Sequence, residues 1–371
     1  MYASNVLGII YSNVYDDHLK ELTTVRTMGS VPFAGRYRLI DFVLSGMVNS
    51  GITKVGISTK ANYQSLMDHL GSGQAWDLSR KRDGMTILPP FNHSDSGVYQ
   101  SRLEALHGMM AYISKSGKDY VVLADCNAVC NINYADILDF HQESGADITI
   151  AYKRGIAPKL KNIMTFDIEG NDIRKVTVDQ HGDEACDYAL NIIVMSRVLL
   201  QRIISAAAGS GSIRESFEQE AIAKNVSNLK IKGYKVDTYA KTIDSLQSYY
   251  DISMQLLSGE FRDLFTKCNP VYTKVRDDMP AIYGVCSKAS NSLVADGCII
   301  KGTVENSVLS RGVQVAEGAV VKNSIIMQDC FIGAGAAINC AILDKDVVIK
   351  PNRELSGAET YPLYIGKGTI V

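Results

Sequence analysis

Three arginines lie close together near the start of the sequence, at positions 26, 36 and 38. A guanidinium group binds phosphate through two parallel N–H donors, so clustered arginines suit a small phosphorylated ligand. Arg26, Arg36 and Arg38 are therefore our candidates for an effector or phosphate site. For any single arginine, the alternative is an ion pair with a nearby acid at the surface.

The eight cysteines do not have the spacing of a metal site. They are scattered without a paired CxxC framework, and only Cys126 and Cys130 are close together. No pair of His or Cys residues accompanies these two, so we expect no zinc site. In a reducing compartment such cysteines act as small buried hydrophobic residues.

Length and composition describe an ordinary globular chain. Its 371 residues favour a large domain plus a smaller one, and its hydrophobic fraction of 46% is typical of folded proteins. The net charge of −2 weighs against non-specific binding to nucleic acid or to anionic membranes. No apolar run approaches a membrane span, and Val6–Tyr11 is too short for a signal peptide. We therefore expect a cytoplasmic protein.

The first half of the chain alternates apolar runs with segments of helical spacing. This alternation predicts an α/β, Rossmann-like domain with a mostly parallel sheet and helices on both faces. Ligands of such sheets bind beyond the carboxyl ends of the strands, here in the loops after Tyr11, Ser58 and Ala124. The expected strands are Val6–Tyr11, Thr53–Ser58, Met85–Leu88, Tyr120–Ala124 and Ile148–Tyr152. The expected helices are Phe42–Ser50, Tyr63–Leu70, Leu103–Ile113, Tyr134–Glu143 and Leu246–Leu257.

The C-terminal region changes character near Asp277 and contains four similar segments. They begin at Asn291, Asn306, Asn323 and Asn339, with spacings of 15, 17 and 16 residues. Small apolar residues and glycines recur between them, as hexapeptide repeats of a left-handed parallel β-helix require. An antiparallel sandwich is the alternative, but the tight Asn-Gly and Asp-Gly hairpin turns that it favours are missing.

The segment RTMGSVPFAGRYRLIDFVLSGMVN, from Arg26 to Asn49, resembles the glucose-1-phosphate adenylyltransferase (ADP-glucose pyrophosphorylase) family. The blocks Gly73-Gln-Ala-Trp-Asp-Leu and Thr86-Ile-Leu-Pro-Pro match its bacterial members, and the similarity to GlgD-type subunits covers nearly the whole chain. The resemblance implies a nucleotidyltransferase-like domain at residues 1–258, a linker at 259–285 and the β-helix domain at 286–371. It also implies the family reaction, in which ATP and glucose 1-phosphate give ADP-glucose and diphosphate with Mg²⁺.

The family's glycine-rich phosphate loop, GGxGxRL, is replaced here by the segment from Asn13 to Leu19. All three glycines are absent, and His18 stands at the position of the arginine. Asp16 and Asp17 would place carboxylates where a triphosphate belongs, which is unfavourable electrostatically. The simplest interpretation is a loop that turns at the surface.

Other positions that the resemblance assigns to ligands have also changed. Met28 replaces a lysine, Asn127 replaces the aspartate that binds Mg²⁺, and Thr242 replaces a second acidic residue. In the family's Trp-Tyr-x-Gly-Thr-Ala-Asp-Ala motif, Ser101-Arg102 replaces Gly-Thr, and Asn191 replaces the glycine of Ser-Met-Gly-Ile-Tyr. Glu104 and Asp125 are the residual candidates for a substrate pocket.

These substitutions predict a regulatory or structural subunit with little or no catalysis alone, acting in bacterial glycogen biosynthesis. The expected partner is a catalytic GlgC-type subunit in a hetero-oligomer, expected to be a heterotetramer, and the expected ligand is a small phosphorylated effector. We expect no metal or cofactor for this chain alone. The alternative is an active nucleotidyltransferase with a rebuilt site that uses Asp125 and Glu104. A hexapeptide-repeat acyltransferase is set aside, because its histidine base would lie in the coils, and no histidine follows position 181.

Overall fold

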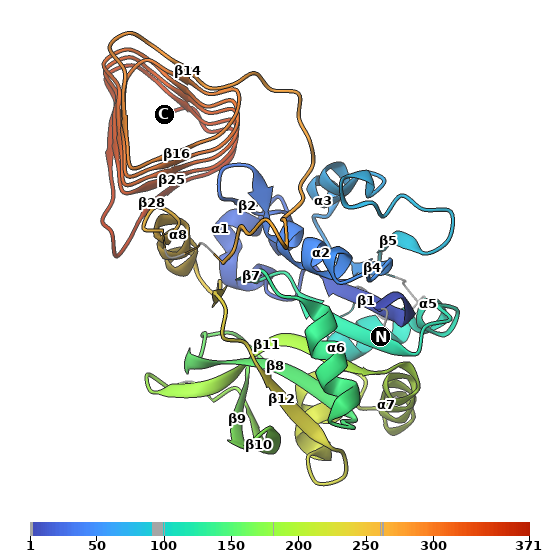
Figure 1. The fold of residues 1–371 in the computed structure, drawn as a ribbon. Helices are drawn as coiled ribbons and strands as arrows, with labels where there is room; N and C mark the ends of the chain where they lie inside the picture. Colours follow the sequence, from blue (N-terminus) through green and yellow to red (C-terminus); the bar gives the residue numbers. More distant parts are fainter. Residues whose placement is uncertain (1–2, 91–98, 100, 181, 260, 262) are drawn as a thin grey trace.

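The computed structural model describes residues 3–90, 99, 101–180, 182–259, 261 and 263–371. It contains an α/β domain beside a three-sided β-helix (Figure 1). Within the motif that includes Arg102, Val98 and Gln100 lie outside the described residues, as does His181.

The α/β domain is built on a nine-stranded sheet with the order β5-β4-β1-β6-β11-β8-β12-β10-β9. Strands β11 and β10 run against the other seven, which share one direction. The predicted Rossmann-like domain is therefore confirmed. The bounds are β1 (Val6–Tyr11), β4 (Lys54–Ser58), β5 (Gly84–Leu88), β6 (Tyr120–Asp125), β8 (Ile148–Ile156), β9 (Met164–Glu169), β10 (Asp172–Val178), β11 (Ala185–Ser196) and β12 (Ile231–Lys235).

Eight α-helices are assigned in the described part of the chain: α1 (Lys20–Thr23), α2 (Leu39–Asn49), α3 (Gln64–Leu70), α4 (Arg102–Gly108), α5 (Met110–Ser114), α6 (Tyr134–Glu143), α7 (Arg197–Ser210) and α8 (Leu246–Gln255). The predicted helix Leu103–Ile113 is two helices, divided at Met109. Gly108 directly precedes this division, and glycine is a weak helix former. Two short antiparallel pairs, β2 (Pro32–Phe33) with β3 (Tyr37–Arg38) and β7 (Ala128–Cys130) with β13 (Ala240–Thr242), flank the sheet.

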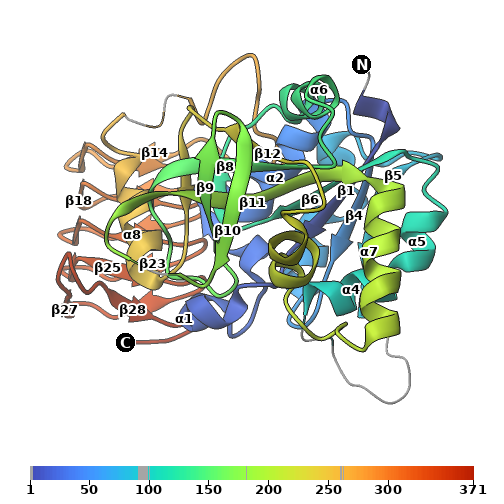
Figure 2. The ribbon, with the colours of Figure 1, turned by 90° about the horizontal axis from the view of Figure 1, so that it is seen from below.

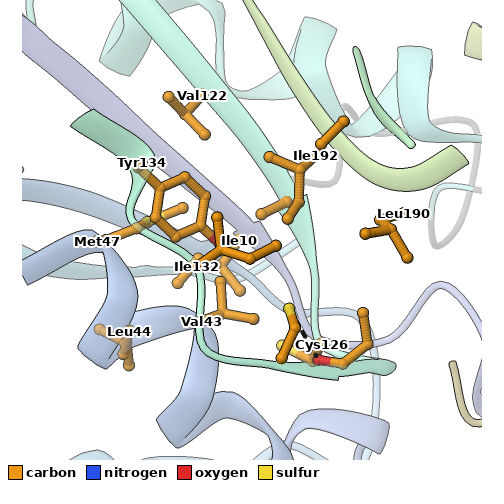
Figure 3. Close-up of a cluster of buried hydrophobic side chains, with 14 of the residues drawn as sticks. Ile10, Val43, Leu44, Met47, Val122, Cys126, Ile132, Tyr134, Leu190 and Ile192 are labelled. Atoms are coloured by element: carbon orange, nitrogen blue, oxygen red, sulfur yellow. Dashed lines mark hydrogen bonds between the residues drawn. The ribbon is translucent and has the colours of Figure 1, made fainter. Parts of the chain in front are cut away.

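Alternation along the strands buries both faces of the sheet. In β1, Ile10 belongs to the apolar layer that includes α2 and α6, whereas Ile9 belongs to the layer that includes α4 and α7. Figure 3 shows the first layer, where Ile10 and Val122 of the sheet lie near Met47 of α2 and Tyr134 of α6. Every residue of β1 is buried, as expected for a central strand covered by helices on both sides.

The C-terminal region is a left-handed parallel β-helix of hexapeptide repeats, as predicted. Its three faces are five-stranded parallel sheets, and Figure 2 shows the coils stacked from β14 toward β27 and β28. The first sheet contains β14 (Ile282–Tyr283), β17 (Ile299–Ile300), β20 (Gln314–Val315), β23 (Phe331–Ile332) and β26 (Val348–Ile349). The second contains β15 (Lys288–Ser290), β18 (Thr303–Glu305), β21 (Val320–Lys322), β24 (Ala337–Asn339) and β27 (Glu354–Ser356). The third contains β16 (Leu293–Val294), β19 (Val308–Leu309), β22 (Ile325–Ile326), β25 (Ala341–Leu343) and β28 (Leu363–Ile365).

The repeats that the sequence predicts are corners of the β-helix. Asn291, Asn306 and Asn323 have φ values of 42°, 45° and 46°, in the left-handed region that asparagine tolerates better than most residues. The fourth repeat is shifted by one residue from the prediction, because Ile325 pairs with Ile342 and places Cys340 opposite Asn323. Cys340 accordingly takes the left-handed conformation, with φ of 48°.

The segment between α8 and β14, expected to be a linker, packs against the α/β domain. The side-chain amide of Asn131 donates hydrogen bonds to the carbonyls of Leu264 and Asn269, at 3.0 and 2.7 Å. Helix α8 contacts both domains: Tyr249 Oη donates to the carbonyl of Pro32, and Tyr250 Oη donates to that of Asn323. None of the helices in the described residues is long and apolar enough to span a membrane.

Candidate functional site

A cavity of about 760 Å³ opens where β1 and β4 end. The loops after Tyr11 and Ser58, two of the three loops that the sequence predicts, contribute to its lining. Arg102, Lys161 and the segment from Arg214 to Glu218 complete the wall. We call this cavity the crevice.

The loop after β1 is held by its own side chains. Asn13 Oδ1 accepts a hydrogen bond from the backbone N–H of Lys60 (2.9 Å), and Asp16 Oδ1 accepts one from that of Met28 (2.7 Å). Asp16 lines the crevice with Asp17 and His18, but its Oδ2 also accepts a hydrogen bond, from Nδ2 of Asn13, so it offers no free carboxylate to a ligand, contrary to the expectation. Burial raises the pKa of Asp16 to about 7, against the opposing effect of the Met28 hydrogen bond.

The loop does turn at the surface, where Val14 and Asp17 are exposed, but it is also anchored in the core by Tyr15, which is only 3% exposed. Its hydroxyl accepts a hydrogen bond of 2.7 Å from Nδ2 of Asn191 on β11. Asn191 has a left-handed φ of 55°, at a bulge where the register of β11 with β8 shifts. A glycine, which the related family has at this position, would tolerate that conformation as well but could not make the hydrogen bond.

A buried ion-pair triad lies at the floor of the crevice. Nη2 of Arg102 contacts both oxygens of Asp125, at 2.8 and 3.1 Å, and Nη1 lies 3.2 Å from Oε1 of Glu218. The two carboxylates outweigh the effect of burial, so the pKa of Arg102 lies above its usual value. Sequence reasoning predicted neither Glu218 nor the pairing of Arg102. The one sequence feature that could have indicated this ion pair is the long cationic side chain of Arg102 in place of the family's Gly-Thr.

Asn127 and Thr242, which replace two acidic residues of the related family, lie close together and carry no charge. Thr242 pairs with Ala128 in the register of β13 and β7, and the N–H of Ile243 donates to the carbonyl of Asn127. Nδ2 of Asn127 and Oγ1 of Thr242 are buried without a hydrogen-bond partner in the described structure. Met28, which replaces the lysine, is also buried, at 2% exposed.

These residues do not fit a magnesium ion. Mg²⁺ prefers carboxylate oxygens, whereas the side chains here are an amide and a hydroxyl, and Asp125 is already ion-paired. Across the described ranges, no group of three or more His, Cys, Asp or Glu side chains could hold a metal ion. We therefore derive no catalytic step through a metal for this chain.

Glu104 and Asp125 have different surroundings. Glu104 lines a second cavity of about 380 Å³, bounded by Pro89, Pro90 and Met109. Asp125 pairs with Arg102 at the floor of the crevice.

The three candidate arginines differ in environment. Arg26 is 1% exposed, and its Nη1 forms an ion pair of 2.8 Å with Asp344, just after β25 of the β-helix. Arg38 precedes α2, and its Nη1 donates to the carbonyl and the hydroxyl of Ser65, at 2.6 and 2.9 Å. Arg36 is exposed, with its guanidinium carbon 5.7 Å from the ring centroid of Tyr37. Arg26 therefore does form an ion pair, as the alternative for a single arginine predicts, but this pair is buried between the two domains and does not lie at the surface.

Lys345 adds a fourth cation, which the sequence did not single out. Burial lowers the pKa of its ammonium to about 7, and the charges of Arg38 and Arg26 lower it further, whereas Asp344 opposes them. We call Arg26, Arg38, Lys345 and Asp344 the junction cluster. Three cations therefore meet here, with Asp344 beside Arg26 and with Asp41 and Asp68 acting on Arg38, and such a group of cations is suited to an anion.

Comparisons with known proteins agree with this architecture. Residues 15–161 match the nucleotidyl transferase family, and residues 281–359 match the GlmU-like C-terminal hexapeptide family. The chain is 38% identical over 372 residues to the glycogen biosynthesis protein GlgD of Bacillus subtilis, covering 100% of this chain and 98% of that protein. It is also 38% identical to GlgD of Geobacillus stearothermophilus, over 99% of this chain and 97% of that one. Identity to the glucose-1-phosphate adenylyltransferase of Thermosipho africanus is 31%, over 86% and 78% of the two chains.

Proposed function

The chain belongs to the glucose-1-phosphate adenylyltransferase family, with GlgD glycogen biosynthesis proteins as full-length relatives, and on this premise we propose that it is a regulatory subunit with little or no catalysis of its own. In this proposal it acts in the cytoplasm, in bacterial glycogen biosynthesis. A catalytic GlgC-type subunit would supply the active site, in a hetero-oligomer that we expect to be a heterotetramer.

The observation that carries this proposal is the uncharged pair Asn127 and Thr242. The family reaction brings a triphosphate and a sugar phosphate together, so its site needs cations and carboxylates that hold Mg²⁺. Asn127 and Thr242 stand at two such carboxylate positions with unpartnered polar atoms. No side-chain charge replaces the lysine at Met28, and His18, which lines the crevice, replaces an arginine.

The scaffold around these positions is intact, which supports a role in assembly. The sheet, α8 and all five coils of the β-helix are present, and α8 ties the two domains together. Loss of ligand residues on a complete scaffold is typical of a subunit that stabilises or modulates a partner.

The experiment is to mix the purified chain with a GlgC-type subunit and measure the mass of the intact complex. We expect a mixed complex whose ADP-glucose formation responds differently to effectors from that of the catalytic subunit alone. The proposal is contradicted if the two chains do not associate.

The alternative is an active nucleotidyltransferase in which Asp125 and Glu104 take over metal and sugar contacts. The pairing of Asp125 with Arg102 weighs against it, as does the separate cavity of Glu104. Calorimetry with ATP and Mg²⁺ discriminates between the two functions. Heat of binding that disappears in Asp125→Ala would favour the alternative.

We further propose that a small phosphorylated effector binds at the junction cluster. Arg38 and Lys345 supply the charge, whereas Arg26 is engaged with Asp344 and orients that carboxylate. The supporting observation is that Arg38, Arg26 and Lys345 lie close enough for their charges to repel one another, because a bound dianion would relieve this repulsion. Arg36, which is exposed beside Tyr37, would contribute long-range attraction rather than a fixed contact.

A further inference from the structure

The replacement of Gly-Thr by Ser101-Arg102 builds new contacts as well as removing old ones. Ser101 Oγ caps α4 by accepting from the N–H of Glu104 (3.0 Å), and it donates to the carbonyl of Ile213 (2.8 Å). Arg102 then extends from α4 to Asp125 on β6 and to Glu218. The two substituted residues therefore join three segments that are far apart in the sequence.

Burial makes the charge of Arg102 a requirement of the fold. The side chains of Arg102, Asp125 and Glu218 are 3%, 1% and 2% exposed, so water cannot neutralise them. Two buried carboxylates without a cation would be strongly unfavourable, because each ion loses its hydration. The guanidinium also lies 4.8 Å from the centre of the Tyr11 ring, where a cation is attracted to the aromatic face.

The guanidinium of Arg102 lies at the end of the sheet where ligands of such folds bind. Asp125 is the last residue of β6 and pairs in register with Tyr11, the last residue of β1, so the triad sits at the carboxyl edge of the parallel strands. Both oxygens of Asp125 are taken by one Nη2 group. A metal ion could reach this carboxylate only by displacing Arg102.

We propose that Arg102 is a resident counter-ion, which takes the place of a divalent cation between Asp125 and Glu218 and closes the crevice floor to metal ions. This deepens the proposed function and rests on its claim that the crevice does not catalyse. The related family brings a metal ion to this end of the sheet, whereas this chain carries the positive charge on its own side chain. The crevice is therefore stable without any ligand.

Terbium luminescence tests the inference directly, because Tb³⁺ binds carboxylates and is excited through a nearby tyrosine, here Tyr11. We compare the native chain with Arg102→Met. The matched control is Arg214→Met, which removes an exposed arginine from the wall of the same crevice. Arg102→Met should reach half its signal at a Tb³⁺ concentration at least about tenfold lower than the native chain or the control. Adding Asp125→Asn to Arg102→Met should abolish this gain.

A thermal series keeps the inference testable if Arg102→Met does not fold. The triple variant Arg102→Met/Asp125→Asn/Glu218→Gln removes all three charges and should melt at a higher temperature than Arg102→Met. The double variants Arg102→Met/Asp125→Asn and Arg102→Met/Glu218→Gln each keep one carboxylate and should have intermediate melting temperatures. A triple variant no more stable than Arg102→Met would overturn the inference. So would a folded Arg102→Met that binds Tb³⁺ no better than Arg214→Met. Neither readout uses ADP-glucose formation, so this inference and the proposed function can fail separately.

Discussion

The crevice and the junction cluster each contain a buried arginine–aspartate pair, but their charge balance is opposite. In the triad at the floor of the crevice, one cation, Arg102, serves two carboxylates, whereas Lys20, Lys60, Lys161 and Arg214 belong to the crevice wall. In the junction cluster, one carboxylate, Asp344, serves Arg26 while Arg38 and Lys345 add further positive charge. The triad therefore carries an excess of negative charge and the junction cluster an excess of positive charge. This contrast is the basis of our proposals that the substrate site is closed and that the junction cluster binds an effector.

Breaking the junction pair should have the largest effect. Arg26→Met leaves Asp344 buried without its partner, and loss of one member of a buried pair costs about 3–5 kcal/mol of folding free energy. Urea unfolding followed by circular dichroism measures the change. Arg36→Met, at an exposed arginine in the same segment, should stay within about 0.5 kcal/mol of the native chain. Equal stability of the two variants would contradict the difference in role that we assign to these arginines.

The second prediction concerns pH and the loop of the crevice. The pKa of Asp16 is raised to about 7 in the folded chain, from an ordinary value of 3.8, so the folded state holds a proton that the unfolded state has released. This contribution to stability is complete below pH 3.8 and is lost as pH rises to 7, by at most about 4 kcal/mol.

Asp16→Asn keeps an acceptor for the Met28 N–H but does not titrate. The free energy of unfolding of Asp16→Asn should therefore increase relative to that of the native chain as the pH rises from 5 to 8. Asp17→Asn removes a neighbouring charge that also raises the pKa of Asp16, so it should show the same trend only weakly. A constant difference between Asp16→Asn and the native chain across this range would contradict the prediction.

The third prediction sharpens the anion preference of the junction cluster. Sulfate has a fixed charge, so its binding reports the ionisation of the protein. Lys345 has a pKa of about 7, and its charge is present below this value, so sulfate should bind more weakly as pH rises from 6 to 8. Calorimetry should show about tenfold weaker binding for Lys345→Gln, which corresponds to 1.4 kcal/mol. Lys350→Gln, at an exposed lysine of the next turn, should leave the affinity unchanged. Sulfate affinity that is independent of pH would argue against Lys345 as a ligand.

The smallest effect concerns the tie between Tyr15 and Asn191. Tyr15→Phe removes the acceptor of the Asn191 amide and leaves that buried donor unpaired, at a cost of about 1–2 kcal/mol. The exposed Tyr361 provides the matched control as Tyr361→Phe. Thermal unfolding of both variants measures the difference. No loss of stability in Tyr15→Phe would show that the hydrogen bond does not hold the loop after β1.

The fold could be predicted wherever one short segment carries its own signal. β1, β4 and β6 are largely apolar runs, and the β-helix repeats an asparagine at three successive left-handed corners, Asn291, Asn306 and Asn323. The prediction failed where two residue types compete: at the fourth corner the sequence favours Asn339, but strand pairing selects Cys340. The division of the helix at Met109 was missed because periodicity alone does not locate a break.

The site could be predicted only in part, for a related reason. Single positions such as Met28, Asn127 and Thr242 are readable because each departs from a motif of the related family. The buried ion pairs could not be predicted, because the partners are far apart in the sequence. This holds for Arg102 with Glu218 and for Arg26 with Asp344. In the sequence, Asp125 has the appearance of a free metal ligand. Its ion-pair partner, Arg102, is evident only in the fold.

The most direct test of the central claim is ADP-glucose formation by the purified chain alone, with saturating ATP, glucose 1-phosphate and Mg²⁺. The same assay is run in parallel on a GlgC-type subunit and on the mixture. We predict no activity above background for the chain alone, and activity with an altered effector response for the mixture. Turnover by the chain alone at a rate comparable to that of the catalytic subunit would contradict the claim that its substrate site is closed.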